Sequence, residues 1–227
     1  MTFTVLTLAC VMGAVVWWVI RQTINVKPWI ADNGVANVNH TGFVTGPNDN
    51  RTPSLKIGLG VFMAVVTSLF ALFISAYLIR MEVDDWRPLQ EPALLWWNTG
   101  VLLLGSICLQ WAVMSGRRYG STAARGALLG GGICAVIFVT GQFMAWNQLS
   151  AAGYFLRTNP ANTFFYVLTA LHVLHLLGGL VAWGKTMARS WSDSSEAQIQ
   201  LGTELCAVYW HFLLVIWLVL FGLMLST

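Results

Sequence analysis

The chain has 227 residues, of which 57% are hydrophobic and only 9% are charged. Charged residues make up about a quarter of an ordinary globular protein, so this composition excludes a soluble domain. The formal net charge of +3 comes from Lys and Arg residues scattered between apolar stretches, without a basic stripe. Nucleic acid is therefore not an expected partner. The composition predicts an all-α integral membrane protein.

Six apolar stretches are long enough to form transmembrane helices, which need roughly 20 residues each. They cover residues 1–20, 57–79, 92–114, 126–146, 163–183 and 205–225. We therefore predict a six-helix bundle with three parts: an N-terminal helix (1–20), a polar loop (21–55) and a five-helix membrane core (56–227). A cleaved signal peptide is the rival interpretation of the first stretch. It lacks a positive n-region and an A-x-A site, which favours a retained helix.

The basic residues predict the orientation of the bundle. The first, third and fifth links carry four, three and two Lys and Arg residues, nine in all, whereas the second and fourth carry two and one. Positively charged links stay on the cytoplasmic side of a membrane. We therefore expect both termini on the outer side, the periplasm if the protein lies in a bacterial inner membrane.

Three histidines lie in the last two apolar stretches, which contain no Lys, Arg, Asp or Glu: His172, His175 and His211. Imidazoles inside a membrane usually face the bundle interior and have polar partners. His172 and His175 are spaced i,i+3 and share one face of their helix. We expect structural hydrogen bonds across helices to Thr, Trp, Tyr or backbone. Metal or haem ligation, and contact with a partner subunit or lipid, are the alternatives; haem would need histidines on facing helices.

Other polar residues are expected to hold helices together. Glu91 and Glu204 stand at the starts of the third and sixth predicted helices, where a carboxylate caps free N–H groups or pairs with an Arg. Asn98 lies within the third apolar stretch and is expected to bond a neighbouring helix. Gly178 and Gly179 follow the histidine pair and would allow another backbone to come close. No catalytic or metal-binding motif is apparent.

Several motifs carry a resemblance to a known family. The run TFFYVLTALHVLH covers residues 163–175, and an E-x6-HF-x4-W pattern runs from Glu204 to Trp217. The pattern contains the run YWHF, with Trp210 and His211. The third stretch contributes Glu91 and Asn98, and the fourth a Phe-x3-Gln pattern ending at Gln142. Over residues 57–226 the chain resembles subunit III of the haem-copper respiratory oxidases, cytochrome c oxidase subunit III.

The resemblance implies an accessory role in aerobic respiration. Haem and copper would reside in a neighbouring large subunit I, with subunit II in the same complex, and this chain would hold no cofactor of its own. It would bind phospholipids between its helices and support proton-coupled oxygen reduction. The complex would be a proton-translocating cytochrome c oxidase, with this chain non-catalytic.

Three positions depart from the family pattern, because Leu69, Ala145 and Leu214 stand where many members carry an acidic residue. Roles that depend on those acids are therefore not expected here. A related alternative is the subunit-III-like partner of a nitric oxide reductase. A small independent transporter or a di-haem membrane cytochrome is an alternative of a different class; a transporter would usually need embedded charges or broken helices.

Overall fold

Five long α-helices form the part of the chain that the computed structural model describes, namely residues 51–84, 86, 93–156, 159–192 and 195–226 together with Trp17. The helices are α2 (Arg51–Arg80), α3 (Leu94–Tyr119), α4 (Ser121–Ala151), α5 (Pro160–Ser190) and α6 (Glu196–Leu225). All five are long and apolar enough to cross a membrane. The predicted crossing at residues 1–20 lies outside the described residues, so five of the six expected helices are observed.

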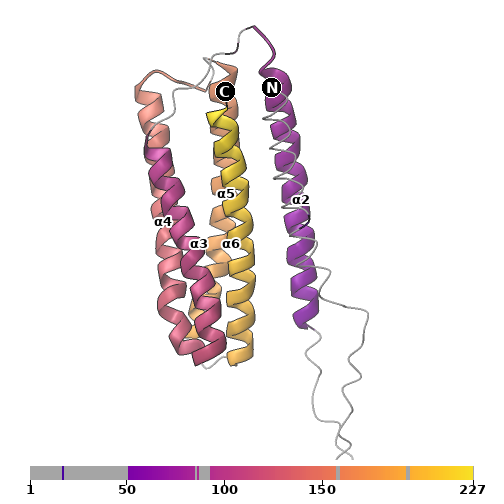
Figure 1. Ribbon diagram of the computed structural model, residues 1–227, viewed down its shortest axis with the longest axis vertical. Coiled ribbons are helices and arrows are strands. Elements are labelled where there is room, and N and C mark those ends of the chain that lie inside the picture. Colours follow the sequence, from indigo (N-terminus) through magenta and orange to yellow (C-terminus); the bar gives the residue numbers. More distant parts are fainter. Residues whose placement is uncertain are drawn as a thin grey trace, which may run out of the picture.

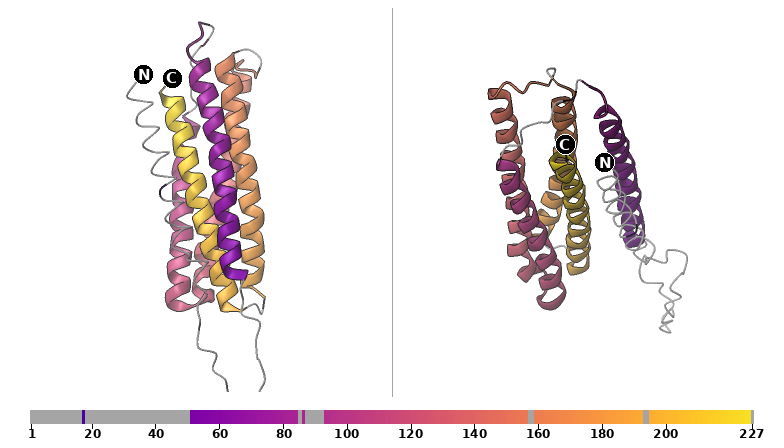
Figure 2. Two further views of the ribbon diagram at one scale, coloured as in Figure 1. Left: turned by 90° about the vertical axis from the view of Figure 1, so that its right-hand side faces the viewer. Right: turned by 45° about the horizontal axis from the view of Figure 1, so that its top comes forward.

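Helices α3, α4, α5 and α6 form an up-and-down bundle, and α2 stands beside it (Figure 1). The neighbours of α2 among the described helices are α5 and α6. The view in which the right-hand side of Figure 1 faces the reader shows α2 lying in front of these two helices (Figure 2). The short connections make sequential helices antiparallel, as in other up-and-down bundles.

The last helix, α6, lies at the centre of the molecule. In its most apolar window 61% of residues are buried, against 33% in the corresponding window of α2. It contacts each of the other four described helices. Lipid-facing side chains of a membrane helix need no protein neighbour, so the low value for α2 indicates a peripheral helix.

The helices extend beyond the apolar stretches seen in the sequence. Most of the link between the fifth and sixth apolar stretches, residues 184–203, is helical, because α5 continues to Ser190 and α6 begins at Glu196. Likewise α2 begins at Arg51, ahead of the expected boundary at residue 56. Hydrocarbon thickness sets the length of an apolar stretch, whereas Lys, Arg, Gln and Glu continue a helix readily into the polar headgroup region. Hydrophobicity therefore underestimates the length of several helices, and α4 extends five residues beyond the stretch 126–146 at each end.

Individual residues in the sequence set where helices begin and end. Gly120 separates α3 from α4 with a φ of 85°, a left-handed conformation that a residue with a Cβ rarely adopts. At the start of α5, the Asn159 side chain accepts a hydrogen bond from the Ala161 N–H at 3.2 Å, and Pro160 occupies the first turn. An Asn N-cap followed by Pro is a strong helix start.

Candidate functional site

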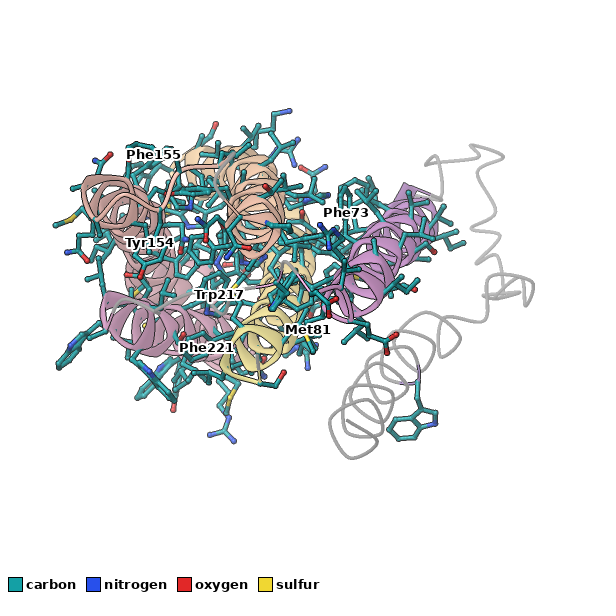
Figure 3. All side chains as sticks on the ribbon, turned by 90° about the horizontal axis from the view of Figure 1, so that it is seen from above. Phe73, Met81, Tyr154, Phe155, Trp217 and Phe221 are labelled. Atoms are coloured by element: carbon teal, nitrogen blue, oxygen red, sulfur yellow. The ribbon has the colours of Figure 1, made fainter. Side chains whose placement is uncertain are left out.

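His172 lies in the core of the α3–α6 bundle and is fully buried. Its ring centroid is 5.3 Å from that of Trp217 on α6 and 5.9 Å from that of Phe138 on α4. Figure 3, seen from above, shows Trp217 in the space that α3, α4, α5 and α6 enclose. Neither ring nitrogen of His172 has a hydrogen-bond partner in the described part of the chain. The interhelical hydrogen bond that we expected for His172 is therefore not made to any residue that the structure describes.

His175, three residues later, faces a different helix. Its ring lies between two α2 side chains, with centroid distances of 6.2 Å to Phe62 and 5.6 Å to Phe70. Its Nδ1 donates to the carbonyl of Leu171 in the same helix at 2.7 Å. The hydroxyl of Tyr209 on α6 donates to the His175 carbonyl at 3.1 Å. This histidine contributes packing between α2 and α5.

His211 on α6 makes an interhelical hydrogen bond of the expected kind. Its Nδ1 lies 3.0 Å from Oγ of Ser106 on α3. The partner is a serine, a residue type that was not among the predicted partners. The three histidines therefore contact three different sets of helices. The described residues contain no group of three or more His, Cys, Asp or Glu side chains placed to hold a metal ion.

Asn98 and Gln142, like His172, are buried within the α3–α6 bundle. Asn98 is 4% exposed and Gln142 is fully buried. Beside them, the indole N–H of Trp217 donates to the Thr99 hydroxyl at 2.9 Å, which joins α6 to α3. Asn98 on α3, Gln142 on α4 and Trp217 on α6 are residues that the family motifs singled out in the sequence. Asn98 itself makes no hydrogen bond through its Nδ2 to another described residue.

Glu204 is not a helix cap, because α6 begins at Glu196, about two turns earlier. The salt-bridge interpretation is the correct one. The Arg117 guanidinium on α3 donates to Oε1 of Glu204 at 2.8 and 3.1 Å. Lys56 on α2 lies 3.9 Å from Oε2. One carboxylate thus joins α2, α3 and α6 at the end of the bundle where the predicted cytoplasmic links lie. Glu91 lies outside the described residues.

Trp210 packs against Gly179, where the sequence predicted a close approach between helices. A Cβ built on Gly179 would come within 2.7 Å of the Trp210 ring and 2.9 Å of the Tyr209 ring. Gly178 differs, because nothing lies within 4 Å of such a Cβ. Only the second glycine therefore permits the close approach of α5 and α6. Gly178 instead faces the groove described next.

A groove of about 490 Å³ separates α2 from α5 and α6. Its walls are mostly apolar, with Phe62 from α2 and Leu205 from α6 among the lining residues. The cationic side chains in the lining are Lys185 and Arg189, both exposed on the last two turns of α5. The groove is open rather than enclosed, and it lies in the half of the molecule that contains Glu204. Sequence reasoning did not locate it.

Sequence reasoning also missed the partners of the predicted residues. Ser106 was overlooked because a serine within an apolar stretch commonly bonds its own helix, as Ser68 does with the Ala64 carbonyl. The ion-pair partners of Glu204, Arg117 and Lys56, could have been predicted from the sequence. Arg117, Lys56 and Glu204 all lie next to apolar stretches, at the ends that the positive-inside pattern places on one side of the membrane.

The three departures from the family pattern occupy different environments. Leu69 on α2 and Leu214 on α6 are half-buried, whereas Ala145 on α4 is fully buried. Thr67 and Ser68, which precede Leu69, bond carbonyls of their own helix. A carboxylate at Ala145 would be enclosed in the bundle, where an unpaired charge is strongly unfavourable.

Comparison with known proteins agrees with this arrangement. The family model described as cytochrome c oxidase subunit III matches residues 4–226, a longer span than the 57–226 that the motifs indicated. A cytochrome c oxidase subunit 3 of Lumbricus terrestris is 28% identical, over 96% of this chain and 83% of the relative.

Bacterial relatives carry the same name. A cytochrome c oxidase subunit 3 of Thermostichus vulcanus is 30% identical, over 74% of this chain and 85% of the relative. A probable cytochrome c oxidase subunit 3 of Mycobacterium leprae is 27% identical, over 76% of this chain and 87% of the relative. These matches extend through most of each protein, and the described helices are of membrane-spanning length. The chain belongs to the cytochrome c oxidase subunit III family.

Proposed function

We propose that this chain is a non-redox accessory subunit of a haem-copper cytochrome c oxidase. It packs beside subunit I in a complex that also contains subunit II, and haem and copper are held by its partners. It supports assembly of the complex and sustained proton-coupled oxygen reduction. The protein lies in a bacterial inner membrane, with both termini in the periplasm.

The groove between α2 and the α5–α6 pair is the observation that carries this proposal. Its apolar walls match acyl chains, and a membrane supplies such chains to any open groove at this depth. The exposed Lys185 and Arg189 lie in its lining, at the end where the nine predicted cytoplasmic basic residues gather. Basic groups beside grooves between transmembrane helices on the cytoplasmic side bind lipid phosphates. The occupant is therefore a phospholipid with its headgroup toward Lys185 and Arg189.

A lipid in this position would support assembly, because α2 contacts the bundle across the groove with few direct helix–helix contacts. Tyr209 and Phe62 line the groove, and their rings lie 5.9 Å apart, so both helices border the same space. Acyl chains between the helices would complete packing that the protein leaves open. Removing the lipid should loosen α2 before it affects the α3–α6 bundle.

Two kinds of variant test the lipid. In the purified complex, Lys185→Gln with Arg189→Gln removes the phosphate partners, and Gly58→Leu fills the groove from α2, where a Cβ meets nothing within 4 Å. Arg118→Gln is the matched control, since Arg118 is exposed at the same end of the molecule and outside the groove. Native mass spectrometry of the detergent-extracted complex counts bound phospholipids.

We expect the two groove variants each to lose tightly bound phospholipid, while the control keeps the parental number. An unchanged lipid count in both groove variants, with the complex assembled, contradicts the lipid part of the proposal. The subunit role is tested separately by the proteins that co-purify. Recovery without a haem-copper subunit would overturn it.

The chemistry of the co-purified complex separates the two related roles. The apolar residues at Leu69, Ala145 and Leu214 leave the partner of a nitric oxide reductase as a second candidate. Oxygen consumption by the complex supports the oxidase, whereas reduction of nitric oxide with little oxygen consumption supports the alternative. Expressed alone, the chain should show neither a Soret band nor stoichiometric copper; one haem per chain would overturn the accessory role.

The orientation has its own test. Reporter fusions after Tyr119 and Ser194 should report cytoplasm, and fusions after Asp85 and Thr158 should report periplasm, because positive charge is retained inside. A fusion after Asn50 should report cytoplasm as well. A periplasmic signal there would mean that residues 1–20 do not cross the membrane and would reduce the helix count to five.

A further inference from the structure

Three side chains buried in the α3–α6 bundle, Asn98, Gln142 and His172, together hold five polar atoms without hydrogen-bond partners in the described part of the chain. They are Nδ2 of Asn98, both amide atoms of Gln142 and both ring nitrogens of His172. Asn98 is 4% exposed, and Gln142 and His172 are fully buried, so neither lipid nor bulk water reaches them. A buried polar group without a hydrogen bond is strongly unfavourable, and nearly all such groups in proteins are paired.

Gln142 on α4 is directed toward α5, and His172 on α5 lies at the same height along the bundle. On α4, Phe138, Gln142 and Trp146 follow at i,i+4 and i,i+8 and therefore share one face. Phe138 contacts the His172 ring, and the Trp146 indole N–H donates to the Thr169 hydroxyl at 3.0 Å. Because α4 and α5 are antiparallel, Gln142 points at α5 between Thr169 and His172.

Asn98 reaches the same level from α3. Its amide occupies the space beside Gly141, where an added Cβ would come within 2.9 Å of Cγ and 3.0 Å of Nδ2. Gly141 directly precedes Gln142, so the missing side chain at 141 admits the Asn98 amide next to the Gln142 backbone. Three helices thus direct two amides and one imidazole into one buried region.

The hydroxyls that border this region are already engaged. Thr99 donates to the Leu95 carbonyl and accepts from Trp217. Thr169 donates to the Phe165 carbonyl and accepts from Trp146. Their donor protons are therefore unavailable to the five unpaired atoms, which need a partner that both donates and accepts.

We propose that Asn98, Gln142 and His172 form a binding site for buried water inside the α3–α6 bundle. Amides and a neutral imidazole each present donors and acceptors, which matches the ability of water to donate and accept at once. A buried water needs two to four polar partners, and residues on three helices supply them here. The water joins α3, α4 and α5 beside the direct Trp146–Thr169 hydrogen bond between α4 and α5. The site is distinct from the lipid groove between α2 and α5–α6.

The first test uses the unmodified complex. A cryo-EM map of the intact oxidase, at a resolution that shows ordered waters in other helices, should contain a peak about 2.7–3.2 Å from the Gln142 amide and from one His172 nitrogen. A direct hydrogen bond between Gln142 and His172 with no peak between them would overturn the proposal. So would empty density here in a map that resolves waters elsewhere in the same bundle.

The second test measures coupling. Gln142→Met and His172→Phe should each lower the thermal unfolding temperature of the complex, and the double variant should lose clearly less than the sum. The reason is that each single variant leaves the shared water short of a partner. Gln142→Met combined with His175→Phe is the control, because His175 faces α2 and its Nδ1 is bonded to its own helix. We expect the control pair to be additive. A Gln142–His172 double variant that is just as additive, losing the full sum of the two single losses, would contradict a shared water.

Discussion

The α3–α6 bundle and α2 are held by different kinds of contact. Within the bundle, glycines let helices approach so closely that a side chain would not fit: a Cβ on Gly105 would lie 2.9 Å from Cys134 Cβ, and one on Gly131 within 2.8 Å of Leu109. By contrast, α2 meets α5 and α6 through large rings, such as Phe70 against His175 and Tyr77 against Phe164.

The difference shows how a membrane protein can combine a tightly packed region with an adaptable one. Without a hydrophobic driving force between helices in lipid, close backbone approach at small residues supplies much of the association energy. Ring contacts span a wider gap and leave the groove of about 490 Å³ beside Gly58 and Gly178. Substitutions should therefore affect assembly strongly in the bundle and weakly between the bundle and α2.

The largest effect is expected at Gly179. Gly179→Leu would drive a side chain into Trp210 and Tyr209, and overpacking typically costs about 1–3 kcal/mol. We expect the subunit to be lost from the purified complex or to unfold at a clearly lower temperature. Gly184→Leu on the same helix is the matched control, because nothing lies within 4 Å of a Cβ built on Gly184 and this residue does not line the groove; it should keep the subunit in place. Equal losses in both variants would contradict the distinction between the two glycines.

Trp217→Phe is expected to have the next largest effect. It removes the hydrogen bond to the Thr99 hydroxyl in the buried core, worth about 1 kcal/mol, together with part of a large buried ring. For a protein of this size such a loss lowers the unfolding temperature by about 2–4 °C per kcal/mol. Trp97→Phe serves as the control, since Trp97 on α3 is 77% exposed. Calorimetry that ranks the control as the more damaging variant would contradict this assignment of the core.

His211→Ala should weaken the contact between α6 and α3 without affecting chemistry. The hydrogen bond to Ser106 is worth about 1 kcal/mol or less in a membrane, so retention on the large subunit should fall slightly. Initial oxygen consumption, normalised to haem, should stay within about twofold. A proton-relay or metal-binding histidine would instead cost about 10²-fold or more in turnover.

The partner of His211 provides a control for that experiment. Ser106→Ala removes the same hydrogen bond from the other side, so the two single variants and the double variant should lose similar stability. Turnover reduced by two orders of magnitude in His211→Ala alone, with the complex assembled, would place the histidine in the chemistry. That result would also contradict a non-redox role for the chain.

The smallest effect is expected at the ion pair that joins α2 to the bundle. Lys56 and Glu204 are 3.9 Å apart, and the Lys56 side chain is 40% exposed, so the pair should contribute about 0.2–1 kcal/mol. Lys56→Met should loosen α2 slightly, measured as faster proteolysis of the chain before α3. Arg117→Met should act on α3 instead and destabilise the bundle. Both effects should shrink at high salt; a Lys56→Met effect that persists there would contradict an electrostatic origin.

The sequence alone determined the class of protein and the family. Five apolar stretches became helices at the expected places, because hydrocarbon requires an unbroken helix of apolar residues and leaves few alternatives. The TFFYVLTALHVLH run at 163–175 and the pattern from Glu204 to Trp217 together indicated the family that the comparison later identified. Helix ends were less predictable, since headgroup-level residues at 184–203 are polar whether they are helical or not.

The tertiary structure decided what each polar residue does. His172 and His175 lie about 60° apart on their helix, and only the positions of α2, α4 and α6 determine that one is enclosed in the core while the other meets Phe62 and Phe70. The sequence placed Glu204 near a helix start, but its partners Arg117 and Lys56 come from two distant helices. Periodicity places a residue on a face of its helix, whereas the packing of the other helices decides which neighbours that face meets.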